Sequence, residues 1–159
     1  MIEVGQKIPS LTIKRGVSGG NPVDVDVAAL FAGKKVVVFA LPGAFTPTCS
    51  QKHLPGFMAH SADLAAKGVG LVACLSVNDG FVMGAWAKDQ GVGDEIVMLA
   101  DGGATLTKAL GIDFEIPGMG TRARRGVLIF DDGVLTSIDM EAPGKFEVSS
   151  AEACLVKLG

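Results

Sequence analysis

The pattern of apolar and polar positions along the chain first shows two continuous apolar runs. Residues 36–41 and 70–77 consist mostly of Val, Leu and Ala, which is typical of strands that are buried on both faces of a sheet. The segment Thr48–Lys67 lies between them and is long enough for a helix. Strand, helix and strand at this spacing predict a βαβ unit with two parallel strands.

The pattern continues with two further helices, a short strand between them and a hairpin. A helix is expected over residues 79–90, a short strand over 95–100 and a short helix over 104–110. The apolar residues of the first of these recur at helical spacing: Phe81, Val82, Ala85 and Trp86. Two further apolar runs, 126–130 and 134–138, flank Asp131-Asp132-Gly133 and predict an antiparallel hairpin.

The end of the chain carries a helix-start signal. Ser149 with Glu152 three residues later has the form of a capping box, so a final helix is expected from Ser149 through Lys157. The predicted class is therefore α/β, a thioredoxin-like fold with an N-terminal extension and a mixed central sheet flanked by helices. No linker or repeat is visible and 159 residues suffice for one core, so residues 1–159 are expected to form a single domain.

Composition narrows the classes of function. The chain is 48% hydrophobic and 19% charged with a net charge of −3, which does not fit a disordered protein. The only basic cluster is Arg122, Arg124 and Arg125, whereas a nucleic-acid binder usually shows a wider basic face, so we expect no nucleic-acid partner. The simplest interpretation of that cluster is a solvated turn.

Localisation signals are weak. The longest apolar run, Val36 to Leu41, is far shorter than the roughly 20 residues of a spanning helix, and the N-terminus lacks the order of a signal peptide. The odd number of scattered cysteines, three, does not make a disulfide framework. Reduced thiols fit the cytoplasm, which is the expected compartment, and no membrane association is expected.

The segment from Leu41 to Ser50 offers the most distinctive chemistry. It joins the end of a buried strand to a helix start, and functional sites in α/β sheets gather at such carboxyl ends. Thr46 is placed to be the N-cap and Pro47 the first helical residue, which puts Cys49 at the third position. Free N–H groups and the helix dipole there favour thiolate over thiol, and the thiolate is the nucleophile. A lone cysteine is more often a small buried hydrophobe, but this polar helix start is a poor place for one.

These residues resemble a known family. The pattern Pro42-x-x-x-Thr46-x-x-Cys49 is similar to the active-site signature of peroxiredoxins. The longer run 42–50, together with residues 53–57 and 74–79, looks like the type II (peroxiredoxin V-like) branch. The similarity extends over nearly the whole chain.

The resemblance implies roles for four residues. Cys49 would be the peroxidatic thiol, Thr46 would hydrogen-bond the thiolate and the peroxide, and Pro42 would shield the sulfur. Arg125, by its position before the hairpin strand, would hold the thiolate and stabilise charge as the O–O bond breaks. Arg122 and Arg124 would be solvated or secondary.

The implied activity is that of a thiol-dependent peroxidase. Hydrogen peroxide and organic hydroperoxides would be reduced through a cysteine sulfenic acid, in antioxidant defence and redox homeostasis. Glutathione with glutaredoxin, or thioredoxin, would return the sulfenic acid to the thiol. The resemblance also implies a homodimer with contacts near the active-site loop and no cofactor, and the histidines and cysteines do not form a metal-site pattern.

The other two cysteines are expected to be secondary. Cys74 lies in an apolar run and is most simply a buried thiol, although some type II relatives have a candidate resolving cysteine at this position. Cys154 falls inside the last helix, and Ser149 occupies the place where the mammalian branch has its resolving cysteine. This favours a one-cysteine cycle completed by an outside thiol.

Several alternatives remain open from the sequence. A disulfide reductase is disfavoured because no Cys-x-x-Cys occurs, whereas a redox sensor would need the same oxidisable Cys49. His53 lies four residues after Cys49 and is assigned a structural role. Gly126, where many relatives carry an aromatic residue, would either loosen the packing around Arg125 or widen the pocket.

Overall fold

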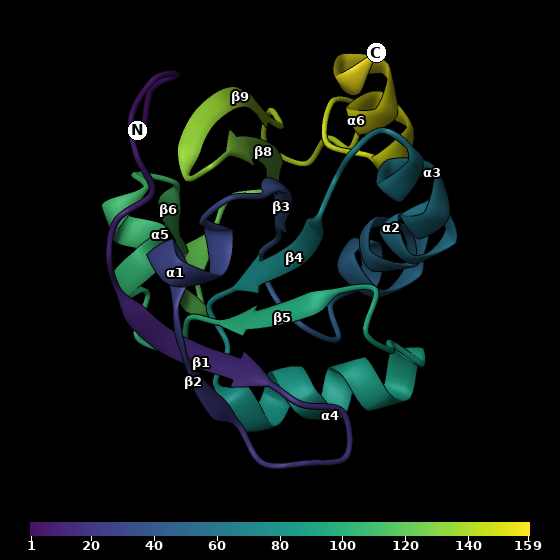
Figure 1. Ribbon diagram of the computed structural model, residues 1–159. Helices are drawn as coiled ribbons and strands as arrows, with labels where there is room; N and C mark the ends of the chain where they lie inside the picture. Colours follow the sequence, from purple (N-terminus) through teal and green to yellow (C-terminus); the bar gives the residue numbers. More distant parts are fainter.

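A seven-stranded mixed sheet runs through the centre of the computed structural model, which describes all 159 residues (Figure 1). The strand order is β2-β1-β5-β4-β3-β8-β9, and β6 and β7 form a separate two-stranded sheet. The strands are β1 (Thr12–Gly16), β2 (Val23–Asp26), β3 (Lys35–Ala40), β4 (Leu71–Ser76), β5 (Val97–Ala100), β6 (Asp113–Ile116), β7 (Gly120–Ala123), β8 (Gly126–Asp131) and β9 (Val134–Met140).

The centre of the sheet follows the predicted plan. β3 pairs with β4 and β4 with β5 in parallel, while β8 is antiparallel to β3. Alternate residues of β3 belong to two hydrophobic clusters, one on each face of the sheet. Both faces are covered, which explains why the two runs are apolar without alternation. The predicted α/β class and the mixed, helix-flanked sheet are confirmed.

The helices lie on both faces of this sheet (Figure 1). They are α1 (Val27–Phe31), α2 (Leu54–Ala59), α3 (Ser61–Ala66), α4 (Gly80–Gln90), α5 (Thr105–Ala109) and α6 (Ala151–Leu158). One hydrophobic cluster includes side chains of α2, α3, α4 and α6, and the other those of α1 and α5. None of these helices is long and apolar enough to cross a bilayer.

The predicted hairpin is present as β8 and β9. Asp132 and Gly133 both have positive φ, 49° and 78°, as a two-residue type I′ turn requires. The N-terminal extension also forms a hairpin, because β1 pairs antiparallel with both β2 and β5 and lengthens the sheet. These two strands were not predicted from the sequence.

The predicted apolar face of α4 was wrong. The helix itself is confirmed, since the Asp79 side chain accepts the Val82 N–H at 2.8 Å and Gly91 ends the helix with φ 70°. Trp86 is buried as expected, but Phe81 is 70% exposed. The buried positions instead include Gly84, which lies so close to the chain after β1 that no side chain fits between them.

Two predicted helix boundaries also differ. Ser150, and not Ser149, is the N-cap of α6 and accepts the Ala153 N–H at 3.1 Å, because the Ser149 side chain is bonded to Glu141. The helix expected over Thr48–Lys67 is divided into a π-helical turn (Cys49–His53), α2 and α3. The Leu54 N–H bonds the Cys49 carbonyl in that π-helical turn, directly before Pro55.

Two helical glycines provide a matched test of the α4 packing. A Cβ on Gly84 would lie 2.7 Å from the Val17 backbone oxygen, whereas a Cβ on Gly56 would have no neighbour within 4 Å. We expect Gly84→Ala to lower the free energy of unfolding by about 1–3 kcal/mol through overpacking. Gly56→Ala should raise it by about 0.5–1 kcal/mol, because alanine restricts the unfolded chain. Urea unfolding measures both, and equal effects of the two substitutions would contradict the packing.

Candidate active site

The loop after β3 leads directly into the helical turn that contains Cys49. Helical structure begins at Pro47, as predicted, and the Ser50 N–H donates to the Thr46 carbonyl at 2.9 Å. The Thr46 hydroxyl does not act as a side-chain cap, since it donates to the Gly43 carbonyl at 2.7 Å. Cys49 is fully buried at this turn.

Arg125 connects Cys49 to a second side chain. It lies directly before β8, and its Nη2 donates to Cys49 Sγ at 3.0 Å. Its Nη1 lies 2.8 Å from His53 Nδ1 and donates to it. The planar guanidinium therefore bonds the sulfur and the imidazole at the same time, through two nitrogens whose relative positions are fixed by the rigid fork.

His53 is held as a neutral imidazole. Its Nε2 lies 2.9 Å from the Ser149 carbonyl and must donate to it, so that Nδ1 is free to accept from Arg125. Burial, together with the positive charge of Arg125, lowers the pKa of His53 to about 3. The ring also lies 5.1 Å from the ring of Phe39 and 5.1 Å from that of Phe146, measured between centroids.

Glu141 fixes the loop that supplies the Ser149 carbonyl. Its carboxylate accepts the backbone N–H groups of Glu147, Val148 and Ser149 at 2.8–2.9 Å, and the Ser149 hydroxyl at 2.7 Å. Burial alone would raise the pKa of Glu141, but these hydrogen bonds outweigh it and hold the pKa below its usual value. The loop is therefore organised around one ionised carboxylate.

Two side chains brace the loop between β3 and Cys49. Asn78 Oδ1, which lies just after β4, accepts the Ala44 N–H at 2.9 Å. Arg122 Nη1 donates to the Pro42 carbonyl at 3.3 Å and to the Val77 carbonyl at 3.4 Å. Arg122 is therefore not simply a solvated turn residue, because it links the Pro42 loop to the end of β4.

The space beside Gly126 is filled from the neighbouring strand. Gly126 pairs with Met140 across β8 and β9, and the Met140 side chain occupies the position that a Cβ on Gly126 would take. The two consequences considered from the sequence, loose packing or a wider pocket, are therefore both absent at this position.

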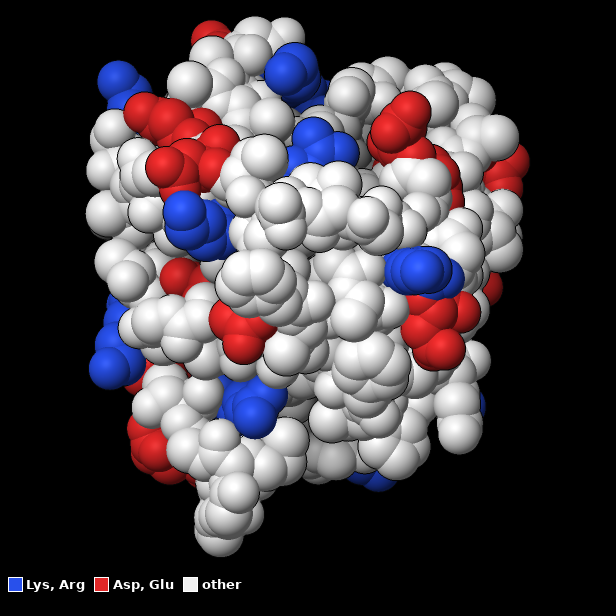
Figure 2. Space-filling view, turned by 90° about the horizontal axis from the view of Figure 1, so that it is seen from below, with Lys and Arg blue, Asp and Glu red and all other residues white.

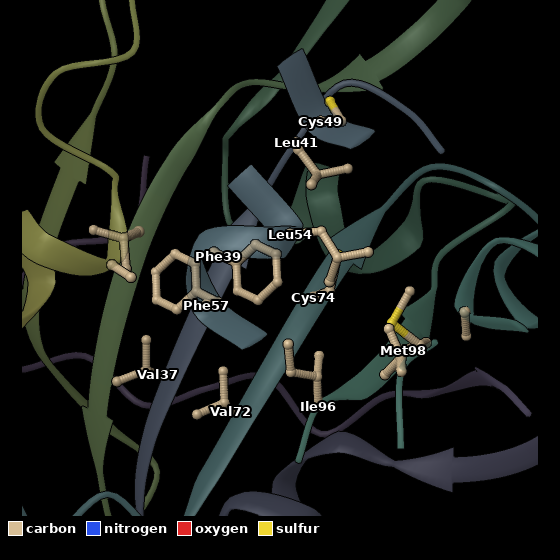
Figure 3. Packing of buried hydrophobic residues seen from close by; sticks show 14 of the residues in the cluster. Val37, Phe39, Leu41, Cys49, Leu54, Phe57, Val72, Cys74, Ile96 and Met98 are labelled. Atoms are coloured by element: carbon tan, nitrogen blue, oxygen red, sulfur yellow. The ribbon is translucent and has the colours of Figure 1, made fainter. Parts of the chain in front are cut away.

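The other two cysteines are buried thiols. Cys74 is fully buried in β4, where burial raises the pKa of its thiol well above the usual value and the nearby Cys49 raises it further. Cys49 and Cys74 belong to the same buried hydrophobic cluster, together with Leu41 and Leu54 (Figure 3). Cys154 is buried within α6, and burial raises the pKa of its thiol to about 11. All three cysteines are free.

The structure thus brings together two of the residues expected from the sequence, Cys49 and Arg125. Pro42 and Thr46 lie in the loop before them. The contact of His53 with Arg125 and the role of Glu141 were not predicted from the sequence. His53 follows the polar residues Ser50, Gln51 and Lys52, and Glu141 lies between a strand and a Pro-Gly turn, so the neighbouring residues do not reveal the partners of either side chain.

Comparison with known proteins gives the family. The Redoxin family model matches residues 3–155. Peroxiredoxin-2B of Arabidopsis thaliana is 42% identical over 99% of this chain and 98% of its own length. The chain belongs to the peroxiredoxins. Peroxiredoxin-2E of the same plant, a chloroplastic protein, is 46% identical over 99% of this chain and 69% of its own length.

A solved structure supports the same assignment for the fold. Reduced Prx3 of Vibrio vulnificus, in complex with H2O2, is 51% identical and superposes with a TM-score of 0.93 over 99% of this chain and 96% of that one. The predicted type II resemblance, the thioredoxin-like fold and the thiol-dependent peroxidase activity in antioxidant defence are therefore confirmed.

The burial of His53 predicts how this peroxiredoxin's stability responds to acid. Between about pH 6.5 and pH 3 the unfolded chain protonates His53 and the folded chain does not, so the free energy of unfolding falls on acidification. The contribution reaches about 1.4 kcal/mol per pH unit. Urea unfolding of His53→Gln between pH 7.5 and 4.5 measures the prediction. The free energy of unfolding of this variant should depend less steeply on pH than that of the wild-type protein, by up to that amount.

His60 is the control for this experiment. This residue is hydrogen bonded to Asp63 and Glu152, and the Asp63 bond raises the pKa of His60. Its stabilising contribution is present below its unfolded pKa and is lost as the pH rises through its folded pKa. In His60→Gln the free energy of unfolding should therefore fall slightly more steeply on acidification than in the wild-type protein. An unchanged slope in His53→Gln would show that His53 is not neutral in the folded protein.

Proposed function

We propose that Cys49 is the peroxidatic thiol and that Arg125 is its charge partner. The observation that carries the proposal is the 3.0 Å contact from Arg125 Nη2 to Cys49 Sγ. A fixed guanidinium at this distance stabilises the thiolate and then the negative charge on the departing oxygen. The sulfur attacks one peroxide oxygen, and the S–O bond forms as the O–O bond breaks. Sulfur is oxidised to sulfenic acid and the peroxide is reduced. Its other oxygen leaves as hydroxide or alkoxide, which takes up the proton that the thiol released on ionising and becomes water or an alcohol.

Thr46 and Pro42 are proposed to position the peroxide. The Thr46 hydroxyl has one proton, which it donates to the Gly43 carbonyl, and its lone pairs therefore remain to accept the peroxide O–H. Pro42 is proposed to shield the sulfur from water, with its carbonyl tethered to Arg122. The related V. vulnificus protein was solved with H2O2, which supports hydrogen peroxide as one substrate, and organic hydroperoxides are proposed as others.

The second half of the cycle is proposed to use an external thiol. Cys74 is fully buried in a central strand, Cys154 is buried in α6, and Ser149 occupies the loop position before α6. A disulfide requires Cα atoms within about 7 Å. Cys49 lies in a helical turn and Cys74 in the middle of β4, so joining them is proposed to require local unfolding of that turn. Glutathione with glutaredoxin, or thioredoxin, is the proposed reductant. A reducing cytoplasm is the proposed compartment, because all three thiols are free.

A peroxidase assay of three variants, each with one cysteine replaced, tests this cycle. We expect Cys49→Ser to abolish turnover of H2O2 with either donor system. Cys74→Ala and Cys154→Ala are the matched controls and should keep wild-type turnover, within about twofold, if neither thiol resolves the sulfenic acid. Turnover by Cys49→Ser would overturn the assignment of the nucleophile. A Cys49–Cys74 disulfide in the mass spectrum of oxidised protein, with loss of turnover in Cys74→Ala, would instead overturn the one-cysteine cycle.

We also propose that the chain forms a homodimer near the active-site loop. Phe45 in that loop is 54% exposed and is held with φ 64°, which is unfavourable for a bulky residue. Phe81 at the start of α4 is 70% exposed. The face of the molecule on the α4 side shows scattered charges of both signs with broad uncharged areas between them (Figure 2). Aromatic residues are enriched at protein interfaces, where side chains that are exposed on the single chain become buried.

Sedimentation velocity tests the dimer. The wild-type protein should sediment with twice the 16.3 kDa mass of one chain. Phe81→Ser should raise the dissociation constant about tenfold or more, as expected for an aromatic residue at the interface centre. Val156→Ser is the control, since Val156 is 82% exposed on α6 and should leave the dimer unchanged. A monomeric wild-type protein would contradict the proposal.

A further inference from the structure

A cavity of about 290 Å³ lies beside the Arg125 guanidinium. Pro42, Thr48 and Arg125 form one side of it, and Arg125 also contacts Cys49 Sγ. Arg125 therefore contacts both the cavity and the reactive sulfur. Its size exceeds what hydrogen peroxide needs and fits a small organic molecule.

The walls of this cavity are partly aromatic. Phe114 from β6 and Phe146 from the loop before α6 both line it. The Phe146 ring is fixed in place, because its centroid lies 5.9 Å from the Arg125 guanidinium carbon and 5.1 Å from the His53 ring. Such surfaces bind the hydrocarbon part of a ligand.

Two further cations line the cavity, and neither is neutralised by the protein. The side chains of Arg124 and Lys145 take part in none of the ion pairs of the structure, which join Lys14 with Asp24, His60 with two acids, and Lys157 with Asp139. Neither side chain is a donor in a hydrogen bond to another residue. The pair therefore offers its positive charge to a ligand.

The acid that lines the same cavity does not compensate these cations. Glu141 uses its carboxylate on four donors of its own loop, from Glu147, Val148 and Ser149. Arg125 is already engaged by Cys49 and His53. The unpaired positive charges of the cavity are consequently those of Arg124 and Lys145, and the apolar side chains of Phe114 and Phe146 line the same cavity. A site of this kind fits an organic anion.

We propose that this cavity is a carboxylate-binding subsite, which makes the protein prefer organic hydroperoxides that bear a carboxylate. The peroxide group would face Cys49 while the hydrocarbon part packs on Phe114 and Phe146 and the carboxylate pairs with Arg124 and Lys145. The proposal rests on the proposed peroxide reduction by Cys49. It extends that function to the class of substrate.

The test compares two peroxides that differ in one carboxylate, cumene hydroperoxide and its 4-carboxy derivative. Trp86, the single tryptophan, donates to the Ser50 hydroxyl at 3.0 Å next to Cys49, so its fluorescence in a stopped-flow experiment follows the oxidation of Cys49. The wild-type protein should react about tenfold faster with the carboxylate at low ionic strength, and added salt should reduce this preference. Because the readout is a ratio of two rates, a general loss of activity in a variant cancels.

The variants assign the preference to the two cations. The double variant Arg124→Gln/Lys145→Gln should bring the ratio of rates close to one. Lys88→Gln/Lys108→Gln, which changes the net charge equally at two exposed lysines outside the cavity, should keep the wild-type ratio. A ratio near one in the wild-type protein, or an equal loss in both double variants, would overturn the subsite.

A second arm separates the peroxide from an acidic reductant. Glutathione also carries carboxylates, so the rate of sulfenic acid reduction is compared between glutathione and neutral 2-mercaptoethanol in the same variants. A cation-dependent preference here, without one among the peroxides, would overturn the proposal by assigning the cavity to the reductant. Failure of both peroxides to oxidise Cys49 would instead refute the proposed function itself.

Discussion

The active site depends on one guanidinium that serves two acceptors. Arg125 donates to the Cys49 sulfur from one nitrogen and to the His53 imidazole from the other. Because the fork is planar and always charged, fixing one of its nitrogens on a neutral acceptor also fixes the direction of the other. The sulfur then meets a donor that is already in place, and little reorganisation is needed as charge moves onto the departing oxygen.

This arrangement requires three distant segments to meet in register. The helical turn supplies Cys49 and His53, the residue before β8 supplies Arg125, and the loop before α6 supplies the Ser149 carbonyl. The antiparallel pairing of β3 with β8 brings the first two together, since Ala40 lies opposite Gly126 at the end of β3. The sheet thus places the start of β8 beside the loop that leads to Cys49.

Local signals explain why parts of the site could be predicted from the sequence. The Thr46-Pro47 helix start and the apolar run before it are short-range features, and they located Cys49 correctly at a helical turn after β3. Arg125 came from the family resemblance. The roles of His53 and Glu141 depend on partners far away in the chain or on a loop conformation that follows folding, so no local pattern could reveal them. The buried face of α4 was predicted wrongly for a related reason. Gly84 is buried by the close approach of Val17, and a glycine has no apolar side chain that would indicate burial in the sequence.

Glu141 shows how a buried charge can serve the site without touching it. An isolated buried carboxylate would be costly, but four donors from its own loop bond the oxygens of this one. The loop closed in this way presents the Ser149 carbonyl to His53 and the Phe146 ring to both His53 and Arg125. The same loop carries Lys145 into the cavity wall. One carboxylate therefore sets both the tautomer of His53 behind Arg125 and the shape of the cavity in front of it.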